Sequence, residues 1–358
     1  MAASRRNALE RERRRLEAAV QARTRRLPGS HKPGEGEFGL DELFAELGPN
    51  TLIELVTVDS VLYVVVVAGR RVRLHTVGSI PEREVQMNRF VLRRLANGRP
   101  QPGDELVLKH RGAKLEASLL GDAAAELGDG PVVVVPPGRL RAVPWTLMPS
   151  LHDRVVTVAP SASTWLRARR MRPPSPRRVA LVAGPGLATK GAEVEPLRSR
   201  YPGAVLLGRG NATASQVLAA LDGAWLAHIA AHGTFRADNP MFSSILLDDG
   251  PLIVHDFERL GRAPYQLVLA GCDSGVAAPV GADELLGLVS SLIPLGAAGI
   301  VASIVPVNDI AAVPIMLALH DALQRGATLP EALLAARRAA ADDPLAEATA
   351  HSFLALGA

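Results

Sequence analysis

Cysteine is almost absent from this chain, which has 358 residues and a single thiol, at Cys272. One cysteine excludes a disulfide framework within the chain and a structural zinc site built on several thiolates. The Arg-rich first 27 residues lack the apolar core of a secretory signal peptide. A lone thiol in a chain without such a signal indicates a reducing compartment, so we expect a cytoplasmic protein.

Lysine is also scarce, with four residues against 36 arginines, and aromatic residues make up 4% of the chain. The net charge is +4, but it is unevenly distributed along the sequence. Residues 1–178 carry a net charge of +11, whereas residues 179–358 carry −7. This asymmetry indicates two regions with different roles.

Long hydrophobic runs are rare, and the one that could cross a bilayer is the uncharged stretch Leu285–Val307. It contains Pro294 and a Gly-Ala-Ala-Gly turn at 296–299, and its flanks are acidic on both sides. Membrane spans are normally flanked by basic anchors. The stretch therefore predicts a buried helix, a turn and a buried parallel strand over residues 299–305, in a soluble protein that contacts no membrane.

Composition divides the chain into three parts. Residues 1–38 form a charged helix over 5–27, with a narrow apolar stripe, and a Pro/Gly-rich linker over 28–38. Residues 39–170 are β-rich, with a predicted three-stranded meander and later helices and strands: strands 51–58, 61–68, 71–77, 132–135 and 155–159, helices 82–96 and part of 106–127. The basic, Pro-rich segment 171–178 leads into the third part, residues 171–358.

The third part alternates between apolar strands and helices. The predicted strands are 179–183, 204–207, 225–231, 266–270 and 299–305, with a hairpin at 244–247 and 252–254. The predicted helices are 193–200, 215–221, 283–292, 310–324 and 330–341. Continuous apolar strands alternating with helices predict an α/β fold, in which helices cover both faces of a parallel sheet.

One histidine and the single cysteine both follow strands of this predicted sheet. His232-Gly233 comes directly after strand 225–231, and Gly271-Cys272 comes directly after strand 266–270. Because the carboxyl ends of parallel strands share one edge, neighbouring strands would bring the imidazole close to the thiol. An imidazole that takes the thiol proton creates a nucleophile. The alternative interpretation is structural, because a lone cysteine often behaves as a small buried hydrophobe.

Other candidate sites are weaker. Gly184-Pro185-Gly186 follows strand 179–183 and resembles a phosphate-binding turn, which would make the protein a nucleotide-binding switch. It lacks the remaining P-loop residues, and Pro185 removes an N–H, so a plain tight turn is favoured. His228 is expected to be a hydrogen-bonded core residue rather than a second base. A metal site built from His228, His232 and Asp238 has poor spacing on a strand, so no metal and no cofactor is expected.

The same residues carry a resemblance to the CHAT family, whose members are caspase-like and separase-like cysteine peptidases of clan CD, often fused to tetratricopeptide repeats. The resemblance covers roughly residues 40–358. Its motifs are His228–Gly233, Asn239-Pro240, Ser243-Ser244, Leu246-Leu247, Asp249–Leu252, Val268–Gly275, Asp283-Glu284 and Gly296–Gly299, with Val143–Trp145 and Pro160–Ser163 upstream and Glu331–Leu333 downstream.

The resemblance implies a caspase-like, parallel or mixed sheet with a degenerate caspase-like half over residues 39–170. It also implies that His232 and Cys272 are the catalytic pair and that the N–H groups of Gly233 and Cys272 form the oxyanion hole. No third member of a catalytic triad is evident. Ala270-Gly271 stands where many members have Ser-Ala, a change that the smaller glycine should tolerate. Ile304-Val305 replaces a Leu-Trp pair, which would reshape a wall of the substrate pocket.

The leading hypothesis is therefore a cysteine endopeptidase that cleaves a protein partner in a bacterial conflict, programmed-death or regulated-proteolysis system. The alternative is a non-catalytic caspase-like interaction module. The narrow stripe of residues 5–27 favours a separate protein activator or an upstream sensor domain, rather than direct nucleic-acid binding.

The stretch of sequence from His232 to Asp309 contains nine acidic residues and three arginines. The acidic residues are Asp238, Asp248, Asp249, Asp256, Glu258, Asp273, Asp283, Glu284 and Asp309. Asp273, Asp283 and Glu284 are the predicted substrate-binding residues, which favours a basic residue on the acyl side of the cleaved bond. The alternative is that Asp256 and Asp283 cap helices.

Overall fold

The computed structural model describes residues 12, 15–16, 38–98, 101–234, 242–271, 292–293 and 295–358. Residues 1–38 form one unit and residues 39–358 a second, and the second is described below. Cys272, Asp273, Asp283 and Glu284 lie outside the described residues, as do Asp238 and nearly all of the helices predicted over 5–27 and 283–292. The division at residue 171 stays a prediction.

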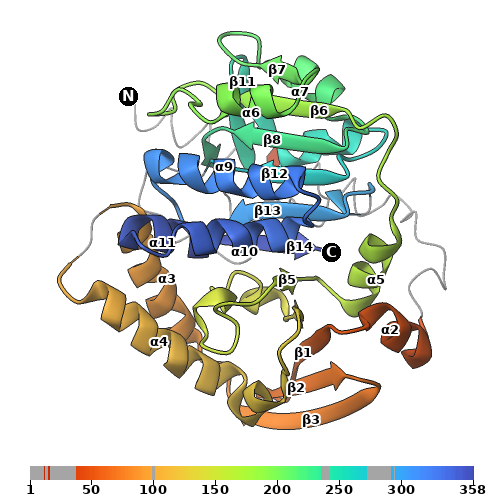
Figure 1. Cartoon of the computed structure of the whole chain (residues 1–358), viewed down its shortest axis with the longest axis vertical. Helices are drawn as coiled ribbons and strands as arrows, with labels where there is room; N and C mark the ends of the chain where they lie inside the picture. The colour runs from red at the N-terminus through yellow and green to blue at the C-terminus, as the bar shows by residue number, and fades with distance from the viewer. Residues whose placement is uncertain are drawn as a thin grey trace. The chain divides into compact units, whose positions relative to one another are not determined.

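A sheet of eleven strands runs through the described part of residues 39–358 (Figure 1). From one edge to the other the strands are β3 (Arg71–Gly78), β2 (Val61–Ala68), β1 (Thr51–Val58), β4 (Val132–Val135), β5 (Val156–Val158), β14 (Phe353–Gly357), β13 (Gly299–Ser303), β12 (Gln266–Leu269), β8 (Leu226–Ala230), β6 (Val179–Ala183) and β7 (Val205–Leu207). A second sheet has the order β11 (Gly250–Ile253), β10 (Ser244–Leu247) and β9 (Gly233–Thr234).

Strands β13, β12, β8, β6 and β7 are parallel to one another, as the apolar strand runs predict. All residues of β8 and β13 are buried, which fits strands covered on both faces. The helices here are α6 (Val194–Arg200), α7 (Ala214–Leu221), α9 (Asp309–Gln324) and α10 (Leu329–Ala339). The chain reverses direction across the sheet between β7 and β8, so right-handed crossovers place α6 and α7 on opposite faces. The predicted α/β fold class is confirmed.

The β-rich part begins with the predicted meander, in which β1 and β2, and then β2 and β3, pair antiparallel. Both turns have two residues with positive φ: 48° and 66° at Asp59-Ser60, and 50° and 65° at Gly69-Arg70. This geometry matches the twist of a tight hairpin. The adjoining helices are α2 (Leu40–Leu47), α3 (Glu82–Ala96), α4 (Asp104–Leu119) and α5 (Ala162–Arg170), with short 3-10 turns at Gly121–Glu126, Gly138–Leu140 and Trp145–Leu147, and another at Val254–Arg259 in the later part.

Strand β14 joins the two sets of strands and makes the sheet mixed. It runs parallel to β5 on one side and antiparallel to β13 on the other. It follows α11 (Pro344–His351), and all five of its residues are buried. Neither α11 nor β14 was predicted, and neither were α2 and α5. Among the described residues, no helix is long and apolar enough to cross a membrane.

Candidate active site

The order β7–β6–β8–β12–β13 contains a topological switch point between β6 and β8. From β6 the chain moves outward to β7 and then returns to the opposite side of β6 to form β8. In open α/β sheets, the crevice at the carboxyl ends of two such strands is the usual ligand site. His232 follows β8 there, and the turn at 184–186 follows β6. The sheet therefore brings these two predicted features together.

His232 is partly exposed, and its Nε2 lies 3.0 Å from the carbonyl oxygen of Gly186. A carbonyl can only accept, so Nε2 carries the proton and donates it to this bond. In the neutral ring the lone pair then resides on Nδ1. The Gly186 carbonyl thus fixes both the tautomer and the orientation of the imidazole, a contribution that the sequence did not predict.

The loop that carries Gly186 is held in place by two further contacts. Leu187 is buried with 7% of its surface exposed, and the N–H of Ala188 donates to Oδ2 of Asp309 at 3.1 Å. Gly186 itself has φ +76°, a conformation that side-chain-bearing residues rarely adopt. Because the turn presents a carbonyl oxygen to His232, and Pro185 has no N–H, it is poorly suited to hold a phosphate.

Strand β12 lies directly beside β8, as the proposed pairing of His232 and Cys272 requires. The register pairs Gln266 with Leu226 and Leu269 with Ile229. Beyond this register the two backbones are in contact, because a Cβ built on Gly271 would lie 1.8 Å from the carbonyl oxygen of Ala231. The residues immediately before Cys272 and His232 therefore touch. The position of the Cys272 thiol stays a prediction.

Gly233 begins the short strand β9, where it is paired with Ile245 of β10. The N–H of Leu246 donates to the carbonyl of His232 at 2.8 Å. In an antiparallel ladder this bond marks Gly233 and Ile245 as a non-hydrogen-bonded pair, so the ladder does not use the N–H of Gly233. The assignment of this N–H to an oxyanion hole stays a prediction.

His228 is a core residue, as predicted. It is fully buried, and its Nδ1 lies 3.1 Å from Nε2 of His320 on α9. Nδ1 of His320 lies 2.9 Å from the hydroxyl of Tyr201, and Nε2 of His228 faces the buried Glu193 carboxylate at 4.0 Å. Burial lowers the pKa of His320 well below its usual range and raises that of Tyr201 to about 12. This buried chain of polar groups anchors β8 to α9, four residues before His232.

Five of the nine acidic residues lie within the described residues, and each is already bound. Asp248 accepts from the N–H groups of Gly210 and Ala212, both at 2.8 Å. Asp249, Asp256 and Asp309 accept from the N–H groups of Ala214, Ile253 and Ala188, and Glu258 pairs with His255 at 2.9 Å. Their structural roles explain these carboxylates without a substrate. The predicted preference for a basic residue therefore depends on Asp273, Asp283 and Glu284.

Two hollows adjoin the switch point. A cleft of about 650 Å³ lies beside Gly186 and is lined by Lys190, Arg198 and Arg209 as well as Glu195 and Asp248. A much narrower pocket of about 30 Å³ lies beneath the backbones of Gly233 and Gly271, and its other walls are mainly apolar. A peptide bound across this edge would have the larger cleft on one side of His232.

Val305, which stands where the resemblance implies a tryptophan, lines a separate hollow at the carboxyl edge of β13. This hollow of about 280 Å³ is also lined by Met87, Phe90 and Arg93 of α3 and by Pro306. The preceding residue, Ile304, is buried, and its carbonyl accepts a hydrogen bond from Arg89 at 3.0 Å. The small side chain at 305 thus leaves open space between α3 and the end of β13.

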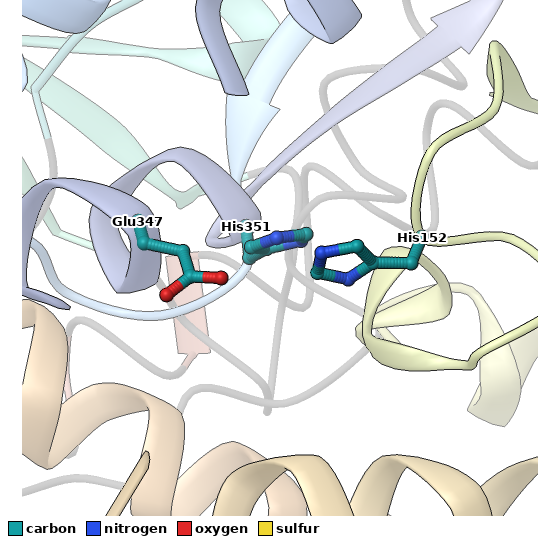
Figure 2. Close-up of side chains that lie close together, drawn as sticks. All are labelled: His152, Glu347 and His351. Atoms are coloured by element: carbon teal, nitrogen blue, oxygen red, sulfur yellow. The ribbon is translucent and has the colours of Figure 1, made fainter. Parts of the chain in front are cut away.

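A group of potential metal ligands lies elsewhere in the described structure. His152, Glu347 and His351 each offer one ligand atom, and these atoms lie within 4.8 Å of one another (Figure 2). This group was not predicted, since the only metal ligands considered from the sequence were His228, His232 and Asp238. The signal that could have found two members is the spacing of Glu347 and His351, four residues apart on one helix.

Comparisons with known proteins agree with the fold. The family model of the CHAT domain matches residues 109–354. Two solved structures of the Saccharomyces cerevisiae separase–securin complex are similar, with TM-scores of 0.63 and 0.61 at 11% and 10% identity. Each alignment covers 89% of this chain but 30% and 31% of the solved chains, so this chain spans less than a third of their length. No match was found among curated proteins.

Proposed function

This chain belongs to the CHAT domain family, and we propose on that basis that it is a cysteine endopeptidase with Cys272 as nucleophile and His232 as base. The observation that carries the proposal is the orientation of His232 by the Gly186 carbonyl at the switch point. With the proton on Nε2, Nδ1 is the acceptor atom of the neutral ring, which is what a general base requires. The contact between Gly271 and Ala231 supports the pairing, because it brings the two strand ends together.

In the proposed mechanism, Nδ1 of His232 takes the thiol proton, and the Gly186 carbonyl stabilises the resulting imidazolium through the bond to Nε2. The Cys272 thiolate attacks the peptide carbonyl carbon, and the N–H groups of Gly233 and Cys272 stabilise the oxyanion. The imidazolium then protonates the leaving amine as the C–N bond breaks. Water hydrolyses the thioester, which releases the acid and restores the thiol.

The proposed substrate is a protein, because the cleft beside Gly186 is open and extends the active-site edge. Separase was solved in complex with securin, and a protein partner is likewise proposed here. We place Asp273, Asp283 and Glu284 in the substrate site. We also propose that the protein acts in a bacterial conflict, programmed-death or regulated-proteolysis system and that a protein activator controls it. The domain division at residue 171 is part of the same proposal.

The test is cleavage-site mapping by mass spectrometry in a proteome digest. New protein termini should appear with the wild-type chain and disappear with Cys272→Ala and with His232→Ala, while both variants keep their urea midpoint. If the wild type cleaves no protein, and the wild type and both folded variants bind the same proteins, the non-catalytic interaction module is favoured instead. Cleavage that persists in a folded Cys272→Ala variant would refute the assignment of the nucleophile.

A further inference from the structure

The side chains of His152, Glu347 and His351 converge at the junction between the two sets of strands (Figure 2). His152 lies in the turn before β5, and Glu347 and His351 lie on α11, just before β14. Residues four apart share one face of a helix, so both helical side chains can reach the same point. Strands β5 and β14 are parallel neighbours, which is why the segments that precede them meet.

The ring of His351 is held in an orientation suited to a metal ligand. Its Nδ1 lies 2.9 Å from the Thr146 hydroxyl, and the side chains of both residues are buried, with 3% and 1% of their surface exposed. If Nδ1–H donates to that hydroxyl, the lone pair resides on Nε2, which is the arrangement found around most metal-bound histidines. The second ring, His152, stacks on His351 with centroids 4.6 Å apart and planes 26° apart.

The charges near the three side chains are mixed: Glu105 favours a cation, whereas Lys109 and Arg337 oppose it.

We infer that His152, Glu347 and His351 bind a divalent transition metal of the zinc type. Two imidazoles and one carboxylate are a ligand set that Zn²⁺ accepts with one further position open to water, whereas Ca²⁺ and Mg²⁺ require mainly oxygen ligands. Ligand atoms in a tetrahedral site are about 3.3 Å apart. The ligand atoms of the three residues lie within 4.8 Å of one another, so movements of about 1.5 Å would bring them to the tetrahedral separation. The partly exposed side chains of His152 and Glu347 can make such movements.

The proposed ion would join the turn before β5 to the helix before β14. Ser352, which follows His351, accepts a hydrogen bond through its carbonyl from the N–H of Ile304, just after β13, at 2.8 Å. The ion would thus stabilise the place where β14 bridges β5 and β13. This role is independent of the proposed peptidase chemistry, because none of the three ligands is part of the site around His232.

The test uses the full chain with Cys272→Ala, which removes the thiol as a competing ligand. We expect equilibrium dialysis to show one Zn²⁺ per chain, and Co²⁺ to give the visible absorption of a tetrahedral site. His152→Ala and Glu347→Gln should abolish that absorption. Thr146→Val should weaken binding by about 10- to 100-fold, because it removes the partner of His351. Zn²⁺ at 100 times its Kd should raise the Tm by about 4 °C.

The matched control is His110→Ala, which removes an exposed histidine from α4 outside the cluster and should leave Co²⁺ binding unchanged. Because His152 and Glu347 are only partly buried, their variants should fold, and the urea midpoint without metal verifies this. No metal uptake by the parent chain would overturn the inference. Uptake that His152→Ala and Glu347→Gln leave unchanged would also overturn it, since the ion would then be bound elsewhere.

Discussion

Replacing Gly186 by alanine tests whether the carbonyl of this residue orients His232. Gly186 has φ +76°, and a Cβ there would make ordinary contact with the imidazole at 3.6 Å. Space is therefore not the obstacle, but the left-handed conformation costs a residue with a side chain about 1–2 kcal/mol. Relaxation toward negative φ would relieve this strain and turn the carbonyl away from Nε2.

The size of the effect follows from the hydrogen bond that would be lost. A bond from a neutral carbonyl to a charged imidazolium contributes about 1.5–3 kcal/mol, which corresponds to about 10- to 150-fold in the population of the thiolate–imidazolium pair. A thiol that is deprotonated less often also gives a thiolate that is intrinsically more nucleophilic. This offsets about half of the change in the logarithm of the reaction rate. We therefore expect Gly186→Ala to slow alkylation of the thiol by about 3- to 12-fold.

The assay is the rate constant for alkylation by iodoacetamide at pH 6.5. It reports on Cys272 alone, because the chain has one cysteine. The matched control is Gly203→Ala, at an exposed turn with φ +85° and nothing within 4 Å of the added Cβ. This variant should lose similar stability in urea without a change in alkylation rate. His232→Ala gives the lower limit of the rate.

Two results would refute this reasoning. If Gly186→Ala reacts as fast as the wild type, the carbonyl does not act through His232. If Gly203→Ala slows the reaction by the same factor, general destabilisation accounts for the loss. A rate in Gly186→Ala that lies between those of the wild type and His232→Ala, with Gly203→Ala unchanged, supports the orienting role.

Three further predictions concern pH, metal and specificity. His320 and His351 stay neutral in the fold, whereas the unfolded chain protonates them. The free energy of unfolding should therefore decrease as the pH falls below 6.5, by up to about 1.4 kcal/mol per pH unit for each histidine. Urea midpoints at pH 8, 6 and 5 measure this decrease, and midpoints that do not change with pH contradict it. EDTA should leave the alkylation rate of Cys272 unchanged, since the proposed chemistry uses no metal; inhibition that Zn²⁺ reverses would count against that. Peptide libraries should show faster cleavage after Arg or Lys, reduced by Asp283→Asn, and fast cleavage after Asp would exclude the preference.

The strands around the switch point could be predicted from the sequence because each is a mainly apolar run with a glycine within three residues of its end. Residues 179–183, 226–230 and 266–269 lie where the pattern places them, to within a residue. The parallel pairing of β6 and β8 follows from the helices α6 and α7 between them, and β8 and β12 are adjacent and parallel, as the sequence predicts. Local patterns suffice here because each strand is covered on both faces.

Strand β14 could not be predicted in the same way. Its residues Phe353–Gly357 follow α11 after one residue and read as the end of a helical segment. The strand forms because β5 and β13 both supply backbone hydrogen-bond partners for it. In sequence, β5 lies at least 195 residues before β14, and β13 lies at least 50 residues before it. Such pairing depends on the assembled sheet rather than on local propensity. The ligand group of His152 and α11 was missed for the same reason, since it forms where β5 and β14 meet.

The partner of His232 shows a different limit of sequence analysis. Cysteine, histidine and carboxylate side chains can be recognised in a sequence from the residue type. A main-chain carbonyl is present at every residue, so the sequence does not indicate which one accepts a hydrogen bond. Gly184-Pro185-Gly186 was noticed because its glycines suggested phosphate binding, which depends on N–H donors, whereas the fold uses an acceptor from the same turn. What selects Gly186 is the conjunction of positive φ, the anchoring of Ala188 by Asp309 and the position of β6 beside β8. A group that orients the proposed base can therefore be absent from the side-chain pattern and still be supplied by the backbone.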